Sequence, residues 1–244
     1  MSWSKGPKLE RYLKLFSTPV SAGQPKYIGV DETWFPSDAD QSCLIVAAYS
    51  ADSSVLGKKD LGGKGHGSGF YMDEIPPVNF NYLVVPAELF ELVKRRKLYV
   101  PRTRREESVN GNFSRYMLTI DGTAFLLNAV MGRRDKALVH GYWKPWLVEE
   151  KLTEKLKRLT GDDTEHSVRC RPGADFEVPA LKAADNIGYR LRDKIIEFPG
   201  QRIDFTEDNL LAMNLNRHEI REFKRPVDDA ATNLPTHEAQ VAAA

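Results

Sequence analysis

The chain has 244 residues, of which 41% are hydrophobic and 28% are charged, so it can fill the core of one large domain with tails. Its 35 Lys and Arg residues balance 34 Asp and Glu residues, and this net charge of +1 neither requires nor excludes a nucleic-acid partner. No stretch approaches the roughly 18 apolar residues of a membrane span. The N-terminus also lacks an apolar signal core, so we expect a soluble, cytoplasmic protein that keeps its two cysteines reduced.

The first half of the chain predicts a helix, three strands and a second helix. Residues 8–16 place Leu9, Tyr12, Leu13 and Phe16 on one helical face, which is typical of a short docking helix. Strands are predicted over 27–32, 42–50 and 80–86, the first two forming a hairpin. The glycine-rich residues 57–69 predict a flexible hairpin tip, and a helix is predicted over 86–97.

The second half begins with a segment, 112–132, that allows two interpretations. As a helix it has one long apolar stripe and ends at Gly132; as a strand it would end at Asp121. The periodicity favours the helix. A strand over 136–143, a helix over 147–159, a strand over 166–171 and a helix from Pro179 follow. After Gly200 we expect two short helices and a disordered tail.

Four carboxylates occupy positions that are normally apolar. Asp31 and Glu32 end the first strand, Asp185 lies within the apolar stripe of the last strong helix, and Asp121 repeats that pattern in the preceding long helix. Carboxylates that converge from separate elements would hold Mg²⁺ or Mn²⁺, the ions used for in-line attack on phosphodiesters. The alternatives are structural: a turn after the strand, a polar interruption at a helix edge for Asp121, and an ion pair of Asp185 with Lys182 or Arg192.

Other catalytic patterns are missing from the sequence. It has no H-E-x-x-H, no G-x-S-x-G and no glycine-rich dinucleotide motif after the first strand. Of the five histidines, His140 and His166 fall near predicted strands, and we interpret both as structural. The aromatic segment 141–146 is interpreted as core packing, with a partner-binding surface as the alternative.

A basic run follows the helix predicted over 86–97. Its composition suits contact with phosphates, although basic residues at a helix end also complement the helix dipole. The cations are Lys94, Arg95, Arg96, Lys97, Arg102, Arg104 and Arg105.

The acidic motifs resemble those of the ribonuclease H-like superfamily. "IGVDET" is similar to the Ile-Gly-x-Asp-Glu opening of type 2 ribonuclease H. Together with "LKAADNIGYRL", it resembles an uncharacterised bacterial family marked by Asp-Glu-Ser after the first strand and Gln-x-Ala-Asp in the closing helix. The resemblance runs from about 26 to 197 and implies an α/β fold with a mixed five-stranded sheet flanked by helices. It assigns metal-ligand roles to Asp31 and Asp185, with Glu32 adjoining.

The chain also departs from that pattern. Thr33 replaces the serine, Lys182 stands where glutamine is usual, and the fourth strand has His140 or a neighbour where an acid is expected. If Asp121 is on a helix, the resemblance matches it to the helix-borne acid of ribonuclease H; if it ends a strand, it would be the fourth-strand acid instead and the strand count would shift. The missing fourth-strand acid puts catalysis in question, since a fold alone does not carry an activity.

Three hypotheses follow. The first is a metal-dependent nuclease in which Asp31, Glu32, Asp121 and Asp185 hold Mg²⁺ or Mn²⁺ and the basic run contacts nucleic acid. The second is a catalytically degraded module that binds nucleic acid or a protein partner. The third is an assembly protein of a phage or mobile element, including a homo-oligomer. In each case we expect an N-terminal docking helix and linker over 1–25, a ribonuclease H-like domain over 26–200 and a C-terminal extension over 201–244.

Overall fold

The computed structural model describes residues 14–35, 42–57, 79–109, 113–141, 145–161, 167–173, 177–194 and 201–224. Its strands are β1 (Tyr27–Trp34), β2 (Cys43–Ser50), β3 (Phe80–Val85), β4 (Lys136–Val139), β5 (Ser167–Cys170) and β6 (Arg202–Ile203). Its helices are the short η1 (Ser53–Leu56), then α2 (Ala87–Arg96), α3 (Arg104–Glu107), α4 (Phe113–Val130), α5 (Pro145–Thr160), α6 (Pro179–Lys194), α7 (Glu207–Ala212) and α8 (Arg217–Lys224).

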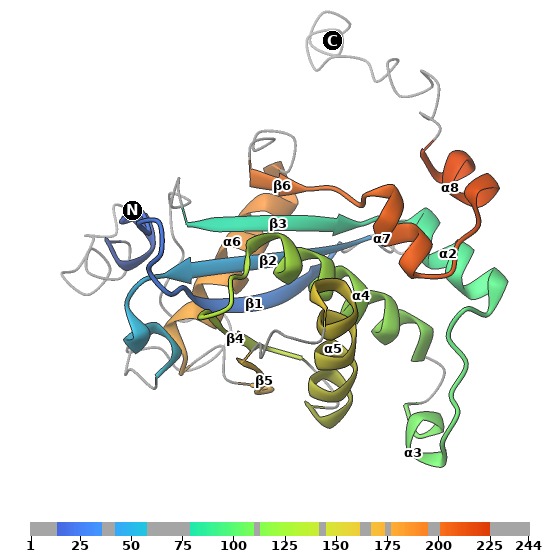
Figure 1. The fold of residues 1–244 in the computed structure, drawn as a ribbon, viewed down its shortest axis with the longest axis horizontal. Helices are drawn as coiled ribbons and strands as arrows, with labels where there is room; N and C mark the ends of the chain where they lie inside the picture. Colours follow the sequence, from blue (N-terminus) through green and yellow to red (C-terminus); the bar gives the residue numbers. More distant parts are fainter. Residues whose placement is uncertain are drawn as a thin grey trace, which may run out of the picture. The chain divides into compact units, whose positions relative to one another are not determined.

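The strands form one mixed sheet in the order β5-β4-β1-β2-β3-β6 (Figure 1). β1, β2 and β3 are antiparallel neighbours, whereas β4 is parallel to β1 and β5 is parallel to β4. The mixed α/β sheet flanked by helices that the sequence motifs imply is confirmed, and so is the predicted order of strands and helices. The two-residue strand β6 pairs with β3 and adds a sixth strand to the five expected.

The segment with two interpretations is a helix, α4. The remaining strands and helices lie within a few residues of their predicted positions, while the short α3 and β6 were not predicted. Several predicted features lie outside the described residues. They are most of the N-terminal helix, most of the glycine-rich segment 57–69, His166, Trp143 and the C-terminal tail.

Helix α6 covers one face of the sheet and packs directly on the backbone of β1. A Cβ added at Gly29 would lie 2.2 Å from the carbonyl carbon of Ala180, and one added at Gly188 would lie 2.4 Å from Oγ1 of Thr33. The helix therefore runs along β1 from Gly29 to Thr33. Neither contact leaves room for a larger side chain, so these two glycines set the distance between the helix and the strand.

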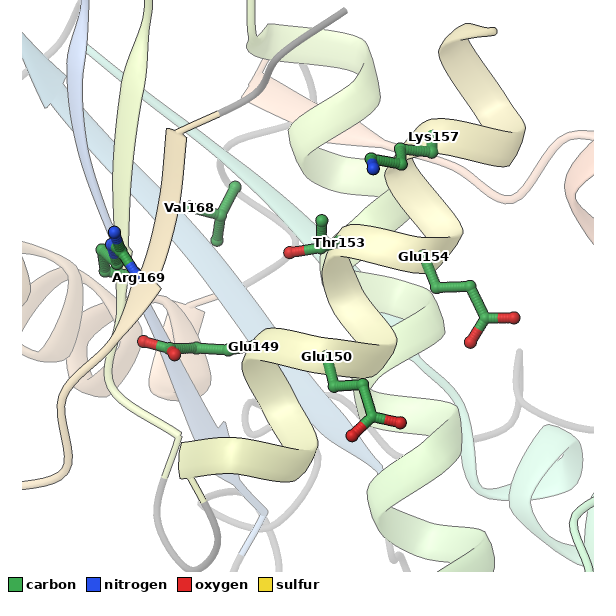
Figure 2. A pocket seen from close by; sticks show the side chains of 7 residues that line it. All are labelled: Glu149, Glu150, Thr153, Glu154, Lys157, Val168 and Arg169. Atoms are coloured by element: carbon green, nitrogen blue, oxygen red, sulfur yellow. The ribbon is translucent and has the colours of Figure 1, made fainter. Parts of the chain in front are cut away.

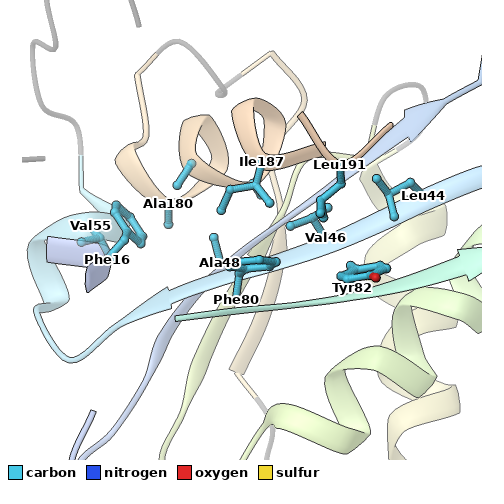
Figure 3. Close-up of a cluster of buried hydrophobic side chains, with 12 residues drawn as sticks. Phe16, Leu44, Val46, Ala48, Val55, Phe80, Tyr82, Ala180, Ile187 and Leu191 are labelled. Atoms are coloured by element: carbon cyan, nitrogen blue, oxygen red, sulfur yellow. The ribbon is translucent and has the colours of Figure 1, made fainter. Parts of the chain in front are cut away.

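The core beneath α6 is aliphatic and aromatic. Figure 3 shows Ala180, Ile187 and Leu191 of α6 directed toward Val46 and its neighbours on β2. Phe16, from the helical residues 14–17, is fully buried in the same cluster. This burial is the observed part of the predicted docking helix.

Helices α4 and α5 lie on the opposite side of the sheet from α6 (Figure 1). Gly122 of α4 faces the side chains of Ile45 and Leu83, which alternate with the residues under α6. Because successive side chains of a strand point to opposite faces, Asp31, whose partner is Val46, points toward α6.

Helix α5 also lies beside β5, one of the two edge strands of the described sheet. The backbone N–H of Cys170 donates to Oε1 of Glu149 at 2.8 Å. A pocket of about 490 Å³ lies between these elements. Figure 2 shows the side chains that line it, among them Thr153 and Glu154 of α5 and Val168 and Arg169 of β5.

The chain divides into two compact units, Met1–Phe205 and Thr206–Ala244. In the second unit, α7 begins with a capping box of Thr206 and Asn209, and α8 begins with the Asn216 and Glu219 pair that the sequence predicts. None of the described helices combines the length and the apolar character that crossing a membrane requires.

We predict that Gly29→Ala destabilises the protein by about 1–3 kcal/mol, because the new methyl group would overlap the backbone of α6. Urea unfolding would measure the loss. The control is Gly57→Ala, where the nearest atom, the carbonyl oxygen of Ser54, would lie 3.5 Å from the methyl group. Equal stability of the two variants would contradict the close contact between α6 and β1.

Candidate metal centre at the carboxyl ends of β1 and β4

Asp31 lies where β1 extends beyond its parallel neighbour. The pairing of β1 with β4 ends at Val30 and Val139, so the next residues of both strands, Asp31 and His140, lie side by side. The N–H of His140 donates to the carbonyl oxygen of Val30 at 2.9 Å, which fixes this register. In sheets with parallel strands, the carboxyl ends are the usual location of binding sites.

The Asp31 carboxylate is buried and held by hydrogen bonds. Its side chain is 4% exposed, and Oδ1 lies 2.8 Å from Nδ1 of His140. The same oxygen accepts the backbone N–H of Glu32 at 2.9 Å. A buried carboxylate needs such partners to offset the loss of water, and two donors on one oxygen also fix its orientation.

The hydrogen bonds determine which nitrogen of His140 carries the proton. The backbone nitrogen of Gly173 lies 3.2 Å from Nε2 of His140 and donates its hydrogen to it, so Nε2 is a hydrogen-bond acceptor and carries no proton. The remaining nitrogen, Nδ1, then carries the hydrogen and donates it to Asp31. Both ring nitrogens are thus used by the protein, and His140 acts as a neutral donor to the carboxylate.

The path of the chain after β4 places His140. Gly141 has a φ of 49°, and a Cβ at this position would lie 2.3 Å from Sγ of Cys170. Only glycine satisfies both conditions readily, because side chains disfavour positive φ. The turn at Gly141 therefore allows the chain to leave the sheet beside β5 while His140 stays next to Asp31.

Glu32 adds a second carboxylate and a negative field. One ligand atom from each of Asp31, Glu32 and His140 lies within 4.8 Å of the other two. Burial and then the charge of Glu32 raise the pKa of Tyr116 to about 12. Burial, then Glu149 and to a smaller extent Glu32 raise the pKa of the Cys170 thiol to about 12. Burial and then Glu32 also raise the pKa of Cys43. A cation at this position would be favoured by the same field.

Asp185 lies on α6, the helix that packs on β1. It is partly buried and lies between Ala180 and Gly188, on the part of the helix that runs along β1. Asp31 lies midway along the same contact. Asp185 is not a member of the three-residue group of described residues whose ligand atoms all lie within 4.8 Å, so its place in the metal centre stays a prediction.

Asp121 lies elsewhere. It is buried on α4, the helix on the other face of the sheet, where Lys155 forms an ion pair with it and the Tyr99 hydroxyl donates to it. Burial raises the pKa of Asp121, while Lys155 and Tyr99 oppose that rise. Burial and the nearby Asp121 also raise the pKa of Tyr99, which therefore remains a donor. Among the described residues, Asp121 joins no group suited to a metal ion.

The basic run divides between two helices and a connection. The cations Lys94, Arg95 and Arg96 occupy the last turn of α2, Lys97 caps that helix, Arg102 precedes α3, and Arg104 and Arg105 begin α3. All seven side chains are exposed. Two contacts hold this region against the helices α4 and α5. Tyr99, in the connection, donates to Asp121 of α4, and Glu106 of α3 pairs with Lys151 of α5 at 3.3 Å.

Asp31 and Glu32, with Asp185 nearby, are the residues that could hold a divalent ion. Mg²⁺ prefers oxygen ligands and is usually bound through one or two carboxylates while it keeps several waters. His140 is better suited to orient Asp31, because both of its nitrogens already have partners. The sequence interpretation of His140 as structural did not identify this contact with Asp31, which depends on the pairing of β4 with β1.

Comparison with solved structures gives ribonucleases H as neighbours. Ribonuclease H2 from Pyrococcus horikoshii OT3 is 17% identical, with 70% of this chain and 74% of that chain covered and a TM-score of 0.47. Bst-RNase HIII in complex with Mn²⁺ is 17% identical, with 79% and 57% covered and a TM-score of 0.40. RNase HII of Archaeoglobus fulgidus, from a complex with PCNA, is 17% identical, with 82% and 91% covered and a TM-score of 0.41. No family model and no curated protein matches the sequence.

We predict that His140 carries its proton on Nδ1, because the Gly173 N–H occupies Nε2. Nitrogen-15 NMR of the imidazole ring distinguishes the two tautomers in the metal-free protein. The exposed His218 serves as an internal reference. A proton on Nε2 would contradict the assignment, and so would loss of the Nδ1 proton when Mg²⁺ is added.

We also predict that Asp121→Asn leaves Mn²⁺ binding unchanged while lowering stability by about 1–3 kcal/mol, because Lys155 loses its charged partner. Asp31→Asn should have the opposite profile and abolish Mn²⁺ binding. Mn²⁺ titration followed by electron paramagnetic resonance, together with urea unfolding, measures both effects. Loss of the ion from Asp121→Asn at full stability would return this residue to the metal centre.

Proposed function

We propose that the protein is a divalent-metal-dependent nuclease of the cytoplasm that hydrolyses phosphodiester bonds in nucleic acid. The observation that carries this proposal is the convergence of Asp31, Glu32 and His140 where β1 extends beyond the carboxyl end of β4. Asp185 is the third carboxylate of the proposed site. We leave Asp121 out because its partners are Lys155 and Tyr99.

The residues of the chain would prepare the site in three ways. His140 and the Glu32 N–H hold the Asp31 carboxylate in one orientation, so little reorganisation is needed when a ligand binds. Burial of Asp31 limits access of bulk water and strengthens its interaction with a cation. When bound, Mg²⁺ or Mn²⁺ supplies positive charge that activates a water nucleophile and stabilises the leaving oxygen. The basic run would contact the phosphate backbone.

The second candidate function is a non-catalytic module that binds nucleic acid through the same surface. It is favoured by one observation: a neutral histidine donor, rather than an acid, follows β4 beside Asp31. A site with one carboxylate fewer has less charge with which to hold two cations.

Cleavage of end-labelled RNA, DNA and RNA–DNA hybrids with Mn²⁺ or Mg²⁺ tests the proposal. We expect metal-dependent cleavage that falls at least about a hundredfold in Asp31→Asn and in Asp185→Asn, because each variant removes a ligand charge. Asp204→Asn is the matched control, since Asp204 is 72% exposed and pairs only with Arg202 among the described residues. His140→Asn, which keeps a donor near the position of Nδ1, should retain more activity than His140→Ala.

Binding without cleavage in any metal would reject the nuclease and support the module. Equal activity of Asp31→Asn and the wild type would show that the cleavage arises elsewhere.

A further inference from the structure

A flat pair formed by Arg115 and Trp34 lies beside the carboxylate cluster. Trp34 ends β1, and Glu32 precedes it by two residues on the same face of the sheet. The guanidinium carbon of Arg115, in the first turn of α4, lies 3.5 Å from the centroid of the Trp34 ring. At this distance the planar guanidinium stacks on the indole and gains cation–π attraction.

The position of this pair is fixed by the elements around it. Trp34 also contacts Phe90 of α2, with ring centroids 5.3 Å apart. The end of β1 is thereby packed between α2, which carries the first part of the basic run, and α4, which carries Arg115. The charges of Glu32 and Arg115 act with opposite sign on the pKa of the partly buried Tyr116, so both lie near that residue.

Arg115 has no anionic partner within the described part of the chain. Its side chain is exposed, and no carboxylate of the described residues lies within ion-pair distance of it. Stacking uses the face of the guanidinium and leaves the N–H groups at its edge available. That edge matches the spacing of two phosphate oxygens, which arginine binds through two parallel hydrogen bonds.

The same arrangement occurs once more along the basic run. The guanidinium carbon of Arg105 in α3 lies 3.6 Å from the centroid of the Trp146 ring. Trp146 is at the start of α5, the helix that follows β4 and His140. Arg105 likewise has no ion-pair partner among the described residues. One stacked arginine therefore lies at the end of β1 and a second at the start of α5.

We propose that Arg115, held flat on Trp34, binds a backbone phosphate of the nucleic acid next to the Asp31 and Glu32 cluster. This inference rests on the proposed function for the identity of the ligand. It assigns a nucleic-acid contact outside the basic run of residues 94–105, and it gives that contact a place relative to the carboxylates. Because a phosphate is common to all nucleic acids, the contact should be independent of base sequence.

Fluorescence anisotropy with a short labelled RNA–DNA hybrid and with its separate strands tests the proposal. The measurements are made in EDTA so that no strand is cut. Arg115→Ala should weaken binding roughly tenfold for every probe, because one charge-assisted contact is lost. The slope of log affinity against log salt should become shallower by about 0.7–0.9, the value for one phosphate. Arg115→Lys should restore only part of the affinity, since lysine lacks the planar stack.

The matched control is Arg133→Ala. Arg133 is an exposed arginine in the turn after α4, at the other end of the same helix. Its replacement by alanine removes the same charge as Arg115→Ala. It should bind like the wild type. Thermal unfolding of each variant verifies folding, and Arg115→Gln, which keeps the length of the side chain, replaces Arg115→Ala if the latter unfolds.

Wild-type affinity and salt slope in Arg115→Ala would overturn the inference, and so would an equal loss in Arg133→Ala. Cleavage that persists with such unchanged binding would leave the proposed nuclease intact. Loss of binding in Arg115→Ala with no cleavage by the wild type would reject the nuclease and keep the phosphate contact. Failure of the wild-type protein to bind any probe would reject both.

Discussion

The contact between α6 and β1 determines how the candidate site is built. Because Gly29 and Gly188 carry no side chains, the helix approaches the strand backbone closely enough for Ala180 and Thr33 to fill the remaining space. A helix held at that distance brings Asp185 alongside the strand segment that contains Asp31. The aliphatic core of β2 and α6 maintains the approach, so the position of one acidic residue depends on hydrophobic packing over the whole length of the helix.

The partners of Asp31 explain how a buried acid is tolerated beside a second one. Two carboxylates in contact repel each other, and a third acid after β4 would increase the repulsion. His140 instead supplies a hydrogen-bond donor, and its other nitrogen ties the ring to the turn at Gly173. The folded protein therefore needs less compensation from a cation than a site made only of acids would. A histidine at this position also leaves less negative charge for binding cations than an acid would, so activity and binding must be measured separately.

The arrangement of strands and helices could be predicted from the sequence, because it is recorded in local periodicity. The apolar stripe of residues 113–130 predicts a helix, and buried runs predict β1, β2 and β3. The strand β6 could not be predicted, since two residues contain no period. The position of Asp121 in an apolar stripe correctly indicated burial, but periodicity does not reveal which face of a sheet a helix will cover. Its partner Lys155 comes from a different helix, so only tertiary packing identifies it.

The contact of His140 with Asp31 depends on the pairing of strands that are 109 residues apart, and no local signal specifies that register. The stacking of the arginines on tryptophans could not be predicted from the sequence for a related reason. Arg115 lies outside the obvious cluster of cations, and its relation to Trp34 exists only after α4 packs beside the end of β1.

The hydrogen bond from Cys170 to Glu149 has a consequence for association between molecules. The outermost strand of a sheet offers unpaired amides to which a strand of another chain can add, the first step of many aggregates. At β5 one such amide is already taken by a carboxylate, and α5 lies beside the strand. An incoming strand would have to displace a negatively charged side chain and contend with a covering helix, so this margin of the sheet resists edge-to-edge growth.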